Sequence, residues 1–85
     1  MYNLVETFEL EDTRAILFKA QDLPSRISEI HLHHDDGSSI KLNDFAFAHF
    51  TQCFSEKQNQ GFSTKTKVPE KYLHQGTKIE LITAH

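Results

Sequence analysis

The chain has 85 residues, of which 38% are hydrophobic and 25% are charged, and its formal net charge is −3. This size and composition predict one globular domain over residues 1–85 and argue against an enzyme that needs two subdomains around a deep cleft. Cys53 is the single cysteine, which excludes an intramolecular disulfide and a zinc site built from cysteines. The N-terminal residues lack the basic and apolar regions of a signal peptide, and no apolar run reaches membrane-spanning length. We therefore expect a cytoplasmic protein with no membrane partner.

Charge is distributed unevenly along the chain. Residues 1–55 contain four basic and nine acidic residues, whereas residues 56–85 contain five basic and three acidic residues. Four of the carboxylates cluster near the N-terminus, at Glu6, Glu9, Glu11 and Asp12. A charged surface attracts a partner of opposite charge over a long range, so this cluster predicts binding to a basic protein surface. The alternative is that these carboxylates only keep the surface solvated.

The first predicted elements are two strands. Residues 2–10 and 14–20 are rich in β-forming residues and are separated by a polar break at residues 11–13. Periodicity alone does not distinguish strand from helix in the second segment. We favour a strand there because the segment is short and Pro24 follows it.

A hairpin is predicted next. Residues 28–34 alternate between one face with two apolar residues and His34 and another face with two further histidines. The apolar residues are Ile30 and Leu32, and the two further histidines are His31 and His33. The Asp-Gly sequence within residues 35–38 is typical of a hairpin turn, and the apolar alternation in residues 40–42 predicts the returning strand.

Apolar residues then recur at helical spacing. The stripe consists of Ala46, Phe47, Phe50, Cys53 and Phe54. With Asn43 or Asp44 as the N-cap, this pattern predicts an amphipathic helix near residues 44–58. A strand at residues 62–68, two tight turns and a last strand at residues 77–83 follow.

Together these elements predict an α+β fold. The expected architecture is an antiparallel sheet of five or six strands, either open or curled into a small barrel, with one helix covering it.

The segment that contains His31, His33 and Asp35 is the strongest candidate for metal chemistry. Two histidines at positions i and i+2 of a strand point to the same side, which is a spacing that a metal ion can use. The run matches H-x-H-x-D and looks like most of the metal-binding motif of the metallo-β-lactamase superfamily. That resemblance implies that His31, His33 and Asp35 are metal ligands. The alternative is an exposed strand face whose histidines are simply polar.

A basic patch follows in the C-terminal third, formed by Lys65, Lys67, Lys71 and Tyr72. Lysines with a neighbouring aromatic ring bind phosphates and stack on bases, so this patch predicts weak nucleic-acid binding. The segment lacks arginine, which disfavours that interpretation. The stronger interpretation is an edge strand whose lysines prevent aggregation.

Residues 7–26 resemble the centre of the small bacterial Rho-binding antiterminators. The matching positions are Thr7, Glu9, Leu10, Asp12, Lys19, Ala20, Asp22, Leu23, Ser25 and Arg26. Members of that family are Sm-like barrels that inhibit the termination factor Rho. The resemblance therefore implies a small acidic β-barrel that binds a basic protein surface, with Asp22 and Arg26 as additional binding residues.

From these patterns we expect a non-enzymatic protein-binding module that acts as a regulator, inhibitor or adaptor through its acidic surface. We expect no cofactor and assign no catalytic residue. The alternatives are a metal-binding or metal-dependent enzymatic site in the histidine hairpin, and a weak nucleic-acid binder. A contact between Cys53 and His49 on the predicted helix is a further alternative, but a cysteine on an apolar helix face more commonly belongs to the core.

Overall fold

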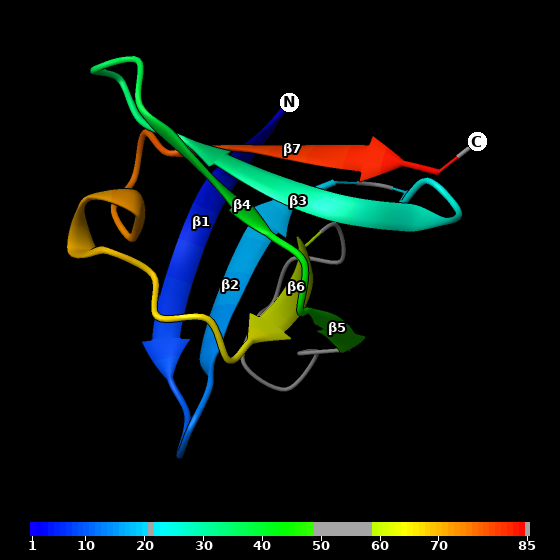
Figure 1. The fold of residues 1–85 in the computed structure, drawn as a ribbon, viewed down its shortest axis with the longest axis horizontal. Coiled ribbons are helices and arrows are strands. Elements are labelled where there is room, and N and C mark those ends of the chain that lie inside the picture. The colour runs from blue at the N-terminus through cyan, green and yellow to red at the C-terminus, as the bar shows by residue number, and fades with distance from the viewer. Residues whose placement is uncertain (21, 49–58, 85) are drawn as a thin grey trace.

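The computed structural model describes residues 1–20, 22–48 and 59–84, and seven strands in these ranges form one antiparallel sheet. In chain order they are β1 (Tyr2–Glu9), β2 (Arg14–Lys19), β3 (Ile27–His33), β4 (Ser39–Leu42), β5 (Ala46–Ala48), β6 (Asn59–Thr64) and β7 (Lys78–Thr83). Their order across the sheet is β4-β3-β7-β1-β2-β6-β5 (Figure 1). A short 3-10 helix, η2 (Glu70–Tyr72), connects β6 to β7.

The predicted α+β class is wrong, because the described residues form an almost all-β fold with no α-helix. The helix expected near residues 44–58 is also wrong. Its first residues form the link before β5 and then β5 itself, while residues 49–58 lie outside the described ranges. Phe47 pairs with Phe62 of β6, and the two rings lie 5.9 Å apart between centroids. A short apolar stretch suits a strand as well as a helix, and here a neighbouring strand supplies the hydrogen bonds.

The sheet curls strongly but does not close into a barrel. β1 pairs with β7 only through Tyr2 and Asn3, and a register shift between Leu4 and Glu6 interrupts its pairing with β2. Such a shift bends a strand and increases its twist. β4 and β5 are the two edge strands of the sheet, and only three residues connect them in the sequence. The end of β4 and the start of β5 therefore lie no more than about 14 Å apart.

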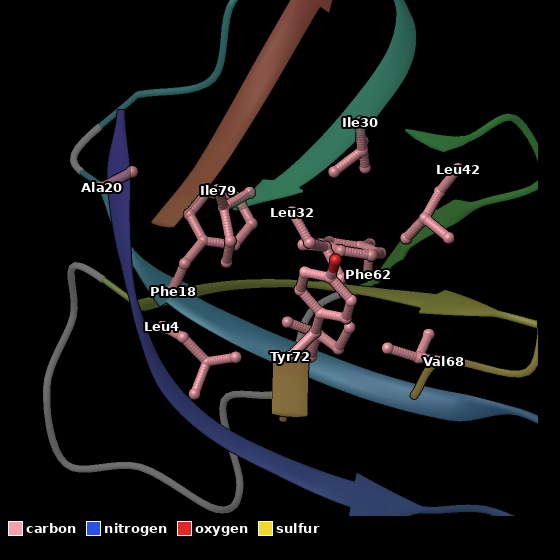
Figure 2. Close-up of a cluster of buried hydrophobic side chains, with 11 residues drawn as sticks. Leu4, Phe18, Ala20, Ile30, Leu32, Leu42, Phe62, Val68, Tyr72 and Ile79 are labelled. Carbon is pink, nitrogen blue, oxygen red and sulfur yellow. The ribbon is translucent and has the colours of Figure 1, made fainter. Parts of the chain in front are cut away.

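The concave side of this curled sheet holds the hydrophobic core (Figure 2). Its fully buried aromatic rings, Phe18 and Phe62, lie 6.1 Å apart between centroids. The other members come from almost every strand and from the segment after β6: Leu4, Ile16, Ala20, Ile30, Leu32, Leu42, Val68, Tyr72 and Ile79. Each large apolar side chain buried in this way contributes about 1.5–3 kcal/mol to the free energy of unfolding.

The predicted hairpin is confirmed. β3 and β4 pair in antiparallel register with Leu32 opposite Ile40, and the turn closes through a hydrogen bond from the Gly37 N–H to the His34 carbonyl. Gly37 has a φ of 91°, a conformation that glycine adopts without a Cβ clash. The predicted strands near residues 2–10, 14–20 and 77–83 are confirmed as well. Within the described ranges, no helix has the length and apolar character needed to cross a membrane.

Candidate functional site

A groove with a volume of about 630 Å³ lies beside the turn that joins β1 and β2, and we call it the turn groove. One wall is the turn itself, with the ends of its two strands: Glu9, Leu10, Glu11, Asp12, Thr13 and Arg14. The other wall is the segment that follows β6: Thr64, Lys65, Thr66, Lys67, Val68, Pro69, Glu70 and Leu73. Figure 1 shows this second segment in yellow, crossing β1 and β2 near their shared turn.

The turn wall carries a net negative charge, with three carboxylates and Arg14, and an exposed apolar residue. Glu9, Glu11 and Asp12 are exposed, and none of them forms an ion pair within the described part of the chain. Leu10 is 41% exposed, and only Met1 among the other described large apolar residues is also exposed. Leu10 thus adds a small apolar surface beside these unpaired carboxylates.

The opposite wall carries Lys65 and Lys67, which are exposed and also lack ion-pair partners among the described residues. They do not lie on a strand as expected, because β6 ends at Thr64. The turn groove therefore combines two features that were predicted separately, the acidic cluster and part of the basic patch.

Asp44 fixes the backbone of the lysine wall. Its carboxylate accepts hydrogen bonds from the Lys65 N–H at 2.8 Å, from the Thr66 N–H at 3.1 Å and from the Thr64 hydroxyl at 3.0 Å. The Thr66 hydroxyl donates to it as well. These bonds, above all the one from the Thr66 hydroxyl, hold the pKa of Asp44 below its ordinary value. Asp44 thus accepts hydrogen bonds from backbone N–H groups, as a helix N-cap residue does, but these groups belong to residues 21 and 22 positions later in the chain.

The remaining residues of the predicted acidic surface do not line the turn groove. Glu6 is exposed on β1. Asp22 and Arg26 are exposed in the connection between β2 and β3. The structure therefore separates the six predicted binding residues, and only Glu9, Glu11 and Asp12 belong to the groove.

The structure also divides the other residues of the basic patch. The Tyr72 side chain is 2% exposed and donates a hydrogen bond to the Ser38 hydroxyl at 2.9 Å, so its ring does not present a surface for stacking on a base. The Lys71 ammonium lies 3.1 Å from Asp36. The Ser38 hydroxyl first, and then the Ser38 N–H and Lys71, hold the pKa of Asp36 well below its ordinary range.

A histidine–carboxylate cluster lies away from the turn groove, on the outward side of β3 and β7. His31, His33 and Glu80 each offer one ligand atom, and these three atoms lie within 4.8 Å of one another. The predicted third ligand, Asp35, is exposed in the hairpin turn and is not part of this cluster. Glu80 takes its place because it pairs directly with His31 across the two strands.

Sequence reasoning missed Glu80 and the apolar groove residues Leu10 and Leu73. The alternation of Lys78 and Glu80 with Ile79 and Leu81 does predict that Glu80 points outward. It does not indicate which strand lies beside β7. His49 and Cys53, considered as a catalytic pair, lie outside the described residues.

These sites have to be interpreted from their own geometry, because a fold alone does not specify a function. The fold offers two separate surfaces, a groove of mixed charge and a histidine–carboxylate cluster. Comparison with known proteins adds no family: no family model, curated protein or solved structure matches the chain significantly.

Proposed function

We propose that this protein is a non-enzymatic binding domain that holds a basic segment of another protein in the turn groove. The observation that carries the proposal is the row of unpaired carboxylates, Glu9, Glu11 and Asp12, on the rim of a groove that also exposes Leu10. Carboxylates left without partners in the free protein are available to pair with lysine or arginine of a ligand.

The exposure of these carboxylates favours binding over catalysis. General acid–base chemistry requires at least one carboxyl group in a dry pocket that raises its pKa. Glu9, Glu11 and Asp12 are exposed to water. The hydroxyls of Thr64 and Thr66, on the other wall, already donate to Asp44.

The charge pattern defines the partner more closely. The acidic turn faces a wall that carries Lys65 and Lys67, so the bound segment has basic residues toward the turn and an acidic residue toward the lysines. An apolar side chain between them contacts Leu10 and Leu73. The volume of the groove, about 630 Å³, suits a few side chains rather than a folded domain.

The resemblance of residues 7–26 to the Rho-binding antiterminators supports the same class of partner. Glu9 and Asp12 are among the matching positions, and both lie in the acidic wall. We also propose a cytoplasmic location, since the single cysteine, Cys53, fits a protein that does not rely on disulfide bonds.

Selection from a phage-displayed peptide library tests the proposal. We expect enriched peptides that combine lysine or arginine with an apolar residue and that shift the amide resonances of residues 9–14 and 64–73 in ¹⁵N-labelled protein. Binding should weaken as salt rises, because the interacting charges are exposed. Enrichment of peptides without basic residues, or shifts confined to other surfaces, would contradict the proposal.

A matched pair of charge-reversal variants provides the control. Glu11→Lys with Asp12→Lys should weaken binding of a selected peptide about tenfold, because two exposed attractions become repulsions. Glu6→Lys with Asp22→Lys changes the net charge equally but lies outside the groove, and should change the affinity less than about twofold. Equal losses for both variants would show that only the overall charge of the protein matters.

A further inference from the structure

The outward side of β3 and β7 places two imidazoles and a carboxylate together. His31 and His33 are two residues apart on β3, and both point away from the core because Ile30 and Leu32 fill the inward positions. Glu80 is the direct partner of His31 on β7. Figure 1 shows these two strands lying side by side.

The distances in this cluster are close to those of a coordination sphere. A tetrahedral ion with bonds of about 2.0–2.1 Å keeps its ligand atoms about 3.3 Å apart. The His33 Nε2 lies 2.9 Å from the Glu80 Oε1, to which it is hydrogen-bonded, and the His31 Nδ1 lies 3.8 Å from the same oxygen. Small side-chain rotations of half-exposed residues are therefore enough to bring all three atoms to one ion.

His31 has an unmet hydrogen-bonding requirement. Its Nε2 is buried and has no hydrogen-bond partner among the described residues. The nearest carboxylate oxygen, Oε1 of Glu29, is 3.6 Å away, which is too long for a hydrogen bond. With Nδ1 bound to a metal, the proton of His31 must be on Nε2, where the Glu29 carboxylate is the nearest carboxylate acceptor. Metal-ligating histidines commonly donate their second N–H to a carboxylate in this way.

The surrounding charges favour a cation. Glu29 and Glu80 contribute two negative charges, while opposite His33 lies Lys78 and opposite His31 lies Lys41. The Lys41 ammonium lies 3.5 Å from Oε2 of Glu29, which leaves Oε1 on the side of His31. Lys78, which precedes Ile79 on the same strand, donates instead to Asn3.

We propose that His31, His33 and Glu80 bind a zinc ion, with Glu29 orienting the His31 ring. Two imidazole nitrogens and one carboxylate oxygen form a donor set that suits zinc. Magnesium and calcium require mostly oxygen ligands and should not bind here. Three protein ligands leave one coordination position for water or for a side chain of another molecule. This site shares no residue with the turn groove, so the zinc proposal and the peptide-binding proposal can be tested independently.

Zinc titration of protein without a histidine tag, treated first with a chelator, tests this proposal. We expect one zinc ion per chain by calorimetry. We also expect a melting temperature, followed by circular dichroism, that rises by about 10 °C or more when free zinc exceeds its dissociation constant about 100-fold. Cobalt should bind at the same stoichiometry and give the visible absorption of a tetrahedral complex, and magnesium should give neither change.

Four variants identify the ligands. His33→Ala and the nearly isosteric Glu80→Gln should weaken zinc binding by about 100-fold or more, and Glu29→Gln by about 10–100-fold with unchanged stoichiometry. His74→Ala, which removes an exposed histidine outside the cluster, should leave the affinity unchanged. Circular dichroism without zinc shows whether each variant is folded. Absence of stoichiometric binding, or an equal thermal shift in folded Glu80→Gln, would overturn the proposal.

Discussion

Asp44→Ala should destabilise the protein strongly although Asp44 is exposed. The carboxylate of Asp44 joins the β4–β5 link to the end of β6 through four accepted hydrogen bonds. Removing it leaves the exposed Lys65 N–H to water, while the Thr66 N–H keeps a second acceptor, the Thr64 hydroxyl, at 3.1 Å. Thr64 is 2% exposed, so its hydroxyl proton loses its acceptor in a buried position.

The expected loss in the free energy of unfolding follows from these contacts. A buried donor left without a partner costs about 1–3 kcal/mol, and each exposed charge-assisted bond contributes about 0.5 kcal/mol. The expected total is about 2–4 kcal/mol, which is a large fraction of the total stability of a domain of this size. It corresponds to a fall in melting temperature of about 10–30 °C.

Urea unfolding followed by far-ultraviolet circular dichroism measures this effect in a chain that lacks tryptophan. Asn43→Ala, in the same link, is the matched control and should change the stability by less than about 0.5 kcal/mol, since Asn43 is exposed. If the two variants unfold at the same urea concentration, the hydrogen bonds of Asp44 do not hold the link to β6 and the reasoning is refuted.

The same variant has a defined pH dependence. The pKa of Asp44 is lower in the folded protein than in the unfolded chain, so its carboxylate stabilises the fold fully above about pH 4. This contribution is lost as the pH falls through the lowered folded pKa. The difference in stability between the wild type and Asp44→Ala should therefore be constant near neutral pH and shrink below about pH 4.

Two further substitutions test individual contacts by urea unfolding. Tyr72→Phe removes a buried hydroxyl that donates to Ser38 and should cost about 1 kcal/mol, whereas Tyr2→Phe should be nearly neutral; equal effects would contradict the role of the bond. Gly37→Ala should cost about 1–2 kcal/mol from backbone strain alone, because no described atom lies within 4 Å of the added methyl group and φ is 91°. An unchanged stability would show that the turn adopts another conformation.

The parts of the fold that the sequence predicted correctly depend on local patterns. The β3–β4 hairpin combines strict alternation with an Asp-Gly turn, and both signals lie within 16 residues of each other. The wrong helix shows the opposite case. Phe45, just before β5, and Phe47, within β5, both pack against the core, but Ala46 and Phe47 also begin a convincing helical stripe. Only the presence of β6, which follows later in the chain, decides between them.

The turn groove was predicted in its parts but not as a whole. The carboxylates of residues 9–12 and the lysines at positions 65 and 67 were each identified as separate surfaces. They face each other because β2 pairs with both β1 and β6, which places Arg14 opposite both Glu9 and Thr64. This pairing joins segments more than 50 residues apart, and nothing in the composition of either segment indicates it.

The histidine cluster shows most clearly what a local motif contributes and what it omits. The i, i+2 spacing of His31 and His33 is sufficient to place both rings on one side of a strand, whatever the rest of the fold. The third ligand depends on register. Asp35 is close in sequence, but it lies beyond the end of β3, where the hairpin turn carries it away. Glu80 is 49 positions from His31 in the sequence. Its two neighbours on β7 pair with the two core residues beside His31, Ile79 with Leu32 and Leu81 with Ile30. This register places Glu80 directly opposite His31. The hydrophobic core therefore sets the composition of the proposed zinc site, because a shift of β7 by one residue would bury Glu80 and expose its apolar neighbours.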